Sequence, residues 1–200
     1  MRAIRVAVAG LGFVGREPVK LLASNRARVQ ERHGAPIELV AVADRDAARE
    51  ARALKLPKSV ARRNDPLELL ALPGVDAIVE LLGGLEAPRR LALQTLRSGR
   101  HLVTANKRLL AYCWDELRVA AGAGGGRLYF EGSVAGGIPL LQALDSSFAA
   151  NRIEAVYGIL NGTTNYILSR AESGISPQAA LAEAQQLGFA EKDPSMDLSG

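Results

Sequence analysis

Short apolar runs alternate with longer amphipathic segments along roughly the first 130 residues. Continuous apolar runs predict buried strands at Ile4–Ala9, Ile37–Ala43, 75–84 and His101–Thr104. Helical spacing of the apolar positions predicts helices at 13–32, 46–54, from 65 onward, 86–97 and 108–121, with a short extended piece around 59–61. This alternation predicts an α/β fold, a parallel sheet covered by helices on both faces.

Prolines and glycines set the expected ends of these elements. Pro18 fits the helix expected over 13–32 only if it lies within the first turn, because proline lacks the backbone N–H that a helix interior needs. Asp65 followed by Pro66 is typical of a helix start. The glycine cluster at 122–126 predicts a turn after the helix at 108–121.

The pattern changes near residue 130. The stretch "YFEGSVAGGIP" predicts a strand that runs into a glycine-rich turn, and "IEAVYGIL" predicts a second strand. Helices are expected at 140–148, 166–172 and 176–187. We therefore predict a dinucleotide-binding domain over 1–130 and the start of an α+β substrate and dimerisation domain over 131–200.

A glycine motif, "GLGFVG", directly follows the first predicted strand and opens a helix. In such a loop Gly10 permits a tight turn, Gly12 lets the backbone approach a pyrophosphate, and Gly15 allows close packing of helix and strand. The helix N-terminus adds N–H groups that favour phosphate. We predict a Rossmann-type doubly wound sheet in which Phe13 and Val14 also contact the dinucleotide. A plain strand-to-helix turn is the alternative.

The ends of the other strands carry further candidates for cofactor contact. Asp44 and Arg45 follow the second strand; an acid there favours NAD, whereas an arginine can hold the 2′-phosphate of NADP. The sequence does not decide between the two cofactors, with a slight lean to NADP through Arg45. Two segments, Gly83-Gly84 and Thr104–Lys107, end the next two long strands, and we expect Gly83 and Lys107 to reach the cofactor, although Gly83-Gly84 could be a simple turn.

Composition excludes some partners. The formal charge is +4, but the arginines form no long basic run and no aromatic-interleaved patch, so no nucleic-acid partner is expected. Cys113 is the single cysteine, which rules out an intrachain disulfide and fits a reducing compartment. The apolar start is too short for a signal peptide or membrane span. We expect a cytoplasmic protein with no membrane partner.

Six segments together resemble the homoserine dehydrogenase family: "VAVAGLGFVG", "VELLGGLEAP", "VTANKRLL", "EGSVAGGIP", "GILNGTTNYIL" and "LGFAEKDPSMDLSG". They follow the family's order and span essentially the whole chain. The resemblance implies NAD(P)H-dependent reduction of the small-molecule substrate L-aspartate 4-semialdehyde to L-homoserine, in threonine, methionine and isoleucine biosynthesis. It also implies a homodimer in the full-length form.

The same resemblance implies roles for particular residues. Lys107 matches an active-site lysine near nicotinamide and substrate, where a cation could stabilise the alkoxide that forms from an aldehyde. The resemblance assigns the substrate loop to Asn161, Gly162 and Thr163, a cofactor contact to Gly188, and substrate-binding acids to Glu191 and Asp197. It assigns a monovalent cation site, usually sodium and built largely from backbone carbonyls, to Glu131, Val134, Gly136 and Ile138.

The match stops at Gly200, before the lysine that serves as the family's proton donor. We therefore expect the second domain to be incomplete, the isolated 200 residues to be nearly inactive, and uncovered apolar faces to favour aggregation. Two other readings stay open: another Rossmann dehydrogenase acting on an amino acid or sugar, and a non-catalytic dinucleotide-binding module.

Overall fold

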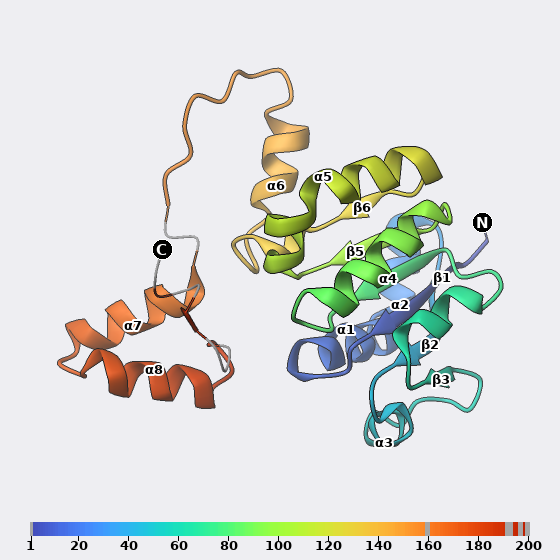
Figure 1. Ribbon diagram of the computed structural model, residues 1–200, viewed down its shortest axis with the longest axis horizontal. Coiled ribbons are helices and arrows are strands. Elements are labelled where there is room, and N and C mark those ends of the chain that lie inside the picture. Colours follow the sequence, from blue (N-terminus) through green and yellow to red (C-terminus); the bar gives the residue numbers. More distant parts are fainter. Residues whose placement is uncertain (1, 159–160, 191–193, 196–197, 199–200) are drawn as a thin grey trace. The chain divides into compact units, whose positions relative to one another are not determined.

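A computed structural model describes residues 2–158, 161–190, 194–195 and 198 (Figure 1). The chain divides into two compact units, residues 1–133 and 134–200. Each unit is described by itself below.

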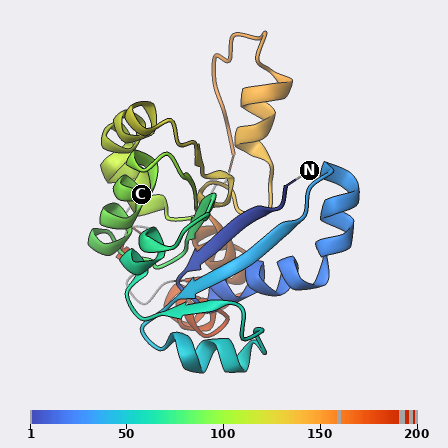
Figure 2. The ribbon, with the colours of Figure 1, turned by 90° about the vertical axis from the view of Figure 1, so that its right-hand side faces the viewer.

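The first unit is built on one parallel sheet of six strands in the order β3-β2-β1-β4-β5-β6. The strands are β1 (Ile4–Ala9), β2 (Ile37–Ala43), β3 (Ala61–Arg63), β4 (Ala77–Glu80), β5 (His101–Thr104) and β6 (Leu128–Tyr129). Figure 2 shows β1, β2 and β3, coloured from blue to cyan, side by side. The strand order reverses between β1 and β4, and ligands of such sheets bind beyond the carboxyl ends of the strands at that point.

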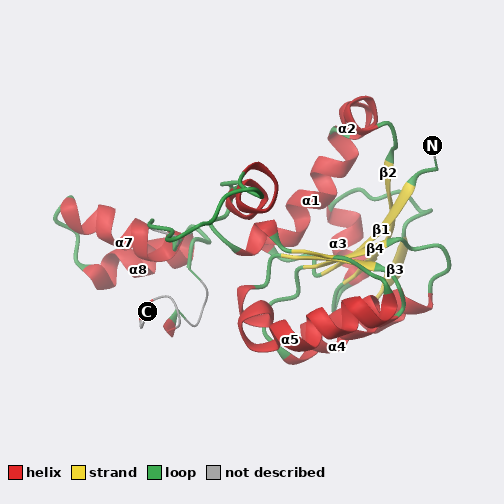
Figure 3. Cartoon of the chain, turned by 90° about the horizontal axis from the view of Figure 1, so that it is seen from above, coloured by secondary structure: helices red, strands yellow, loops and turns green. Residues whose placement is uncertain are grey.

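Helices cover both faces of the sheet, as the alternation of elements predicted (Figure 3). On one face lie α1 (Phe13–Ser24), α2 (Arg26–His33) and α3 (Ala47–Ala53). On the other lie the short 3-10 helix η1 (Pro66–Ala71), α4 (Glu86–Arg97) and α5 (Lys107–Gly124). The predicted α/β class is confirmed.

Successive side chains of β1 pack into the hydrophobic clusters on opposite faces of the sheet. Val8 packs in one cluster with Val19 of α1, whereas Ala7 and Ala9 pack in another with Leu91 of α4. All five side chains are at most 1% exposed. Burial on both faces explains why the strand reads as a continuous apolar run rather than an alternating one.

Two predictions about the first helix are wrong. The helical region does not run unbroken to residue 32, because Asn25 leaves helical geometry (φ −108°, ψ 12°) and separates α1 from α2. Pro18 is the sixth residue of α1 and therefore lies beyond its first turn. The helix accommodates it, at the cost of the one hydrogen bond that a backbone N–H at this position would make to Val14.

The helix α5 is longer than predicted. It begins at Lys107, one residue early, because the side chain of Asn106 caps it by accepting from the N–H of Leu109 at 3.0 Å. It also continues into the glycine cluster and stops only at Gly125, which has a left-handed φ of 76°. Gly124 packs against the backbone of Leu96 and Arg97 so closely that a Cβ there would overlap it.

Two extended segments also differ from expectation. The short strand predicted around 59–61 is β3, displaced by two residues. The strand predicted from Tyr129 ends at once, because the chain turns into a 3-10 helix, η2 (Glu131–Ser133).

Helices make up the regular structure of the described part of the second unit: α6 (Leu140–Gln142), the π-helical η3 (Ala143–Ser147), α7 (Gly162–Glu172) and α8 (Pro177–Gln186). The strand predicted over 153–160 is absent from its described residues, 153–158; residues 159–160 lie outside the described residues. A strand exists only with a partner for its backbone groups, and none pairs with this segment in the described chain. No described helix combines the length and apolar character that a membrane span requires.

Candidate functional site

The glycine loop has the geometry that its sequence predicted at Gly10 and Gly15. Gly10 has a φ of +93°, and a Cβ there would overlap the backbone of Leu81. Its N–H donates to the carbonyl of Ala43 at 2.8 Å, which holds the turn against the end of β2. A Cβ on Gly15 would overlap the carbonyl of Gly10, so α1 starts in close contact with the loop.

Gly12 lies in open space, with no atom within 4 Å of a Cβ built on it. It is the N-cap of α1, no side chain caps the helix there, and the first turn carries no acidic residue. The side chains of Phe13 and Val14 are 75% and 56% exposed. The start of α1 therefore leaves room and backbone donors for the phosphates of a dinucleotide, so the residues present fit that cofactor.

Two charged side chains hydrogen-bond to the backbone of this loop. The carboxylate of Asp44 accepts from the N–H of Leu11 at 2.8 Å, and Nε of Arg16 donates to the carbonyl of Leu11 at 3.1 Å. Arg16 also forms an ion pair with Glu50 of α3. Arg45 follows Asp44 and is exposed at the carboxyl end of β2.

The carboxyl ends of β4 and β5 bring further residues to the same edge of the sheet. Glu80, the last residue of β4, is fully buried, and its Oε2 accepts from the hydroxyl of Thr104 at 2.6 Å. Burial raises the pKa of Glu80, although hydrogen bonds from Thr104, Leu82 and Asn106 oppose the rise. Gly83 has a φ of +73° in the turn after β4, and Lys107 is exposed at the start of α5.

The second unit holds the predicted substrate loop at the start of α7. Asn161 caps the helix by accepting from the N–H of Thr164 at 3.0 Å, and the hydroxyl of Thr163 donates to the carbonyl of Phe189 at 2.7 Å. A cavity of about 350 Å³ is lined by Gly162, Asn165, Tyr166, Ser169 and Phe189. Gly188 has a φ of +79°, and its N–H donates to Gln185 at 3.2 Å just after α8 ends.

The predicted substrate-binding acids and the predicted sodium site are not tested by the described structure. Glu191 and Asp197 lie outside the described residues. Glu131 lies in η2 of the first unit, whereas the other three residues of the predicted sodium site lie in the second unit. Gly136 and Ile138 belong to a turn that the N–H of Ile138 closes onto the carbonyl of Ala135 at 2.9 Å, and Val134 directly precedes this turn. The described residues contain no group of three or more His, Cys, Asp or Glu that could hold a metal. This finding does not test the predicted sodium site, because that site would be built largely from backbone carbonyls. The sodium site therefore stays a prediction.

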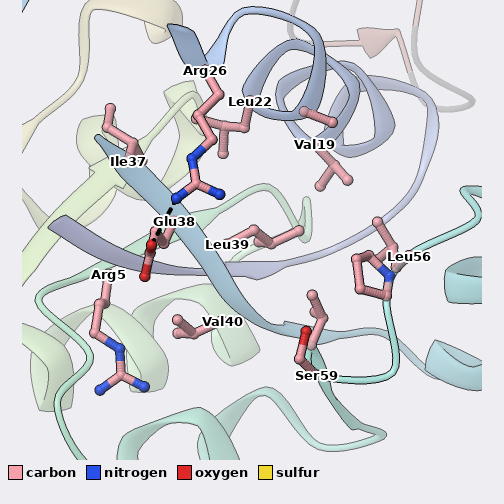
Figure 4. A pocket seen from close by; sticks show the side chains of 13 residues that line it. Arg5, Val19, Leu22, Arg26, Ile37, Glu38, Leu39, Val40, Leu56 and Ser59 are labelled. Atoms are coloured by element: carbon pink, nitrogen blue, oxygen red, sulfur yellow. Dashed lines mark hydrogen bonds and ion pairs between the residues drawn. The ribbon is translucent and has the colours of Figure 1, made fainter. Parts of the chain in front are cut away.

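A larger cavity, about 510 Å³, lies elsewhere in the first unit (Figure 4). It is lined by residues of α1, by the first half of β2 and by the segment before β3, and the ion pair between Arg26 and Glu38 crosses it at 2.9 Å. None of the predicted site residues lines it. Because ligands of this fold bind at the carboxyl ends of the strands, its size does not make it the cofactor site.

Sequence reasoning missed two residues that support the site: Arg16 and Glu80. Glu80 gave a signal, since it is a lone acid at the end of an apolar strand in "DAIVELL". A buried acid at that position needs hydrogen-bond donors, and the threonine that ends the next strand is one of them. Arg16 gave no signal, because its ion-pair partner, Glu50, lies in a distant part of the sequence.

Comparison with known proteins agrees with this geometry. Residues 10–131 match the model of the homoserine dehydrogenase NAD-binding domain, and residues 139–200 match that of homoserine dehydrogenase. The chain is 40% identical over 201 aligned residues to the homoserine dehydrogenase of Bacillus subtilis, covering 100% of this chain and 46% of the relative. The match to that of Neisseria gonorrhoeae has the same identity and coverage.

A crystal structure of a homoserine dehydrogenase from Thiobacillus denitrificans superposes with a TM-score of 0.87 at 40% identity, covering 99% of this chain and 45% of that one. The chain thus spans about half the length of these relatives. Residues 10–131 of the chain, nearly all within the first unit, therefore carry an NAD-binding domain. The chain belongs to the homoserine dehydrogenase family.

Proposed function

We propose that the protein reduces L-aspartate 4-semialdehyde to L-homoserine with NAD(P)H. The observation that carries the proposal is the combination of the two family matches, in order along the chain, with a glycine loop that leaves space at Gly12 for a pyrophosphate. The substrate and the biosynthetic role are inferred from the family name. They belong to the proposal because the chain spans only 46% of the length of the Bacillus subtilis relative.

A bound nicotinamide cofactor supplies the hydride for such a reduction. The residues of this chain bind and orient the reactants. Backbone N–H groups at the start of α1 receive the phosphates, and Lys107 at the start of α5 places its ammonium where the aldehyde oxygen becomes negative. Cations are disfavoured at a helix N-terminus, so a lysine at this position is better explained by a ligand than by helix stability.

The second unit supplies the substrate side of the proposal. Gly162 opens α7, and the bond from Thr163 to Phe189 fixes the segment after α8 to that helix start. This segment leads to Glu191 and Asp197, which we propose bind the substrate's ammonium. Gly188 is proposed as a cofactor contact, and its positive φ is also accounted for by the end of α8.

Cofactor preference, cation and assembly complete the proposal. We propose NADP as the preferred cofactor, because Arg45 is exposed at the end of β2 while one oxygen of Asp44 is already bonded to the glycine loop. A sodium ion at Glu131, Val134, Gly136 and Ile138 and a homodimer of the full-length protein are proposed from the resemblance. Dependence of activity on Na⁺ over K⁺ or Li⁺, and sedimentation of the full-length protein, test these two points.

The decisive experiment follows NADPH absorbance with L-aspartate 4-semialdehyde and the full-length protein. Lys107→Ala should lower kcat by about 10²-fold or more, since it removes the cation from the developing alkoxide. Lys58→Ala, which removes an exposed lysine before β3, is the matched control and should leave kcat unchanged. Turnover of other amino-acid or sugar substrates but not the semialdehyde would support a different dehydrogenase, and cofactor binding without any turnover would support a binding module.

A further inference from the structure

Glu80 is a buried acid, and none of the salt bridges found among the described residues involves it. It ends β4 between Ala9 of β1 and Thr104 of β5, at the point where the strand order reverses, and its exposed fraction is 0%. In the described part of the chain no charged side chain shifts its pKa; the groups that do are Thr104, Leu82 and Asn106. Within the described residues, hydrogen bonds are therefore what hold this buried carboxyl group.

The two oxygens of Glu80 hold two different turns. Oε1 accepts from the N–H of Leu82 at 2.8 Å, in the turn that leads to Gly83. Oε2 accepts from the hydroxyl of Thr104 at 2.6 Å, and that hydroxyl accepts in turn from the N–H of Asn106 at 3.0 Å. One carboxylate therefore connects the turn after β4 with the turn after β5.

Asn106 closes the connection on the solvent side. Its Nδ2 donates to the carbonyl of Gly84 at 2.9 Å, and its Oδ1 accepts from Leu109 at 3.0 Å to cap α5. The residue that carries the proposed catalytic ammonium, Lys107, is the next in the chain and the first of α5. Its backbone position is thus linked to Glu80 through Thr104 and Asn106.

The direction of each hydrogen bond requires an acceptor at both oxygens of Glu80. Thr104 has one hydroxyl proton, which goes to Glu80 while the hydroxyl oxygen accepts from Asn106. A glutamine that accepts from Leu82 would have to donate its NH₂ group to the oxygen of Thr104, and the hydroxyl proton of Thr104 would then lose this acceptor. The hydrogen bonds run in these directions only with the ionised carboxylate.

We propose that Glu80 is a positioning residue that holds the Gly83-Gly84 turn and the start of α5 at a fixed separation, and so places Lys107 for the reaction. The proposal rests on the function proposed above for Lys107. A misplacement of about 1 Å at a reacting centre can lower the rate about 10²-fold, so the fixed separation has a large kinetic effect.

The kinetic test uses the full-length protein and three substitutions. Glu80→Gln and Thr104→Val should each lower kcat at least tenfold with KM for the semialdehyde changed less than threefold, whereas Thr104→Ser keeps the hydroxyl and should retain kcat within threefold. Glu116→Gln breaks an exposed pair with Arg89 and is the matched control. Unchanged kcat in folded Glu80→Gln and Thr104→Val proteins would overturn the proposal.

A second readout does not depend on turnover. Burial raises the pKa of Glu80, so the backbone amide of Leu82, followed by NMR with ¹⁵N-leucine, should titrate with a midpoint above the ordinary range of glutamate. The titration should disappear in Glu80→Gln. A protein that binds NADPH and shows this titration but never turns over the semialdehyde would refute the proposed function and leave the network intact. A Leu82 amide shift that stays constant over the whole pH range in which the protein is folded would refute the network itself.

Discussion

The carboxylate of Asp44 accepts a hydrogen bond from the N–H of Leu11 at 2.8 Å, which joins the end of β2 to the middle of the glycine loop. Arg16 donates to the carbonyl of the same residue at 3.1 Å. Leu11 is therefore held on both its backbone groups by charged side chains. Cofactor affinity should then depend on residues that act on the loop and not only on those that touch the cofactor.

Asp44→Ala should weaken binding of NADH and NADPH alike. A hydrogen bond to a charged group contributes about 1.5–3 kcal/mol, so the dissociation constant should rise about tenfold or more when the loop is released. Nicotinamide fluorescence titration measures both affinities. Asp46→Ala is the control, because Asp46 caps α3 through Arg49 and its loss should lower stability by about 1 kcal/mol without affecting affinity. Equal affinities in Asp44→Ala and the unsubstituted protein would show that cofactor binding does not depend on the hydrogen bond from Leu11 to Asp44.

Alanine at Gly12 should affect cofactor binding, whereas alanine at Gly15 should affect the stability of the fold. Gly12 has a φ of −69° and open space around its Cβ position, so Gly12→Ala should change the free energy of unfolding by less than about 0.5 kcal/mol but obstruct the pyrophosphate. Gly15→Ala places a Cβ against the carbonyl of Gly10 and should lower the free energy of unfolding by about 1–3 kcal/mol. Urea unfolding and NADPH titration separate the two. Retained NADPH affinity in Gly12→Ala would mean that the phosphates bind elsewhere.

Arg45→Ala should discriminate between the two cofactors. If Arg45 holds the 2′-phosphate, its loss raises the dissociation constant for NADPH about tenfold or more and leaves that for NADH within about twofold. Arg49→Ala removes an exposed arginine of α3 four residues later and is the control for a general loss of positive charge. An unchanged NADPH affinity in Arg45→Ala would rule out the proposed preference for NADP through this residue.

The sequence predicted those parts of the fold that depend on local chemistry. The strands β1, β2 and β5 have the predicted bounds, because a buried parallel strand is a continuous apolar run closed by a glycine or a polar residue. The glycine loop was predicted because each glycine has a separate steric reason, which the φ of Gly10 and the close packing at Gly15 confirm.

Features that depend on distant partners were not predictable in the same way. The extra turn of α5 exists because Gly124 packs on the backbone of α4, which no local pattern reveals. The apolar run at 153–158 has strand propensity but lacks a paired strand in the described chain. The bond between Glu80 and Thr104 depends on the register of β4 against β5, which pairs residues 24 positions apart.

Asp76 gives a prediction for the pH dependence of stability. Its carboxylate lies just before β4 and accepts from the N–H of Arg5 at 2.8 Å and from the guanidinium of Arg2 at 2.6 Å. Partial burial alone would raise the pKa of Asp76, but these hydrogen bonds and the two positive charges outweigh it, so the pKa is lowered. A carboxyl group whose pKa is lower in the folded state stabilises the fold above its unfolded pKa and loses that contribution as the pH falls through the folded value.

Asp76→Asn should therefore lower the free energy of unfolding at pH 7 by about 1–2 kcal/mol, because the amide keeps one acceptor but loses the charge and the second acceptor. The difference from the unsubstituted protein should shrink as the pH falls below the ordinary range of aspartate and vanish once Asp76 is protonated. Urea unfolding at stepwise lower pH measures it. Asp115→Asn, on the exposed face of α5, is the control for the loss of one carboxylate at the surface. A deficit in Asp76→Asn that is as large in acid as at pH 7 would assign the loss to packing rather than to the charge.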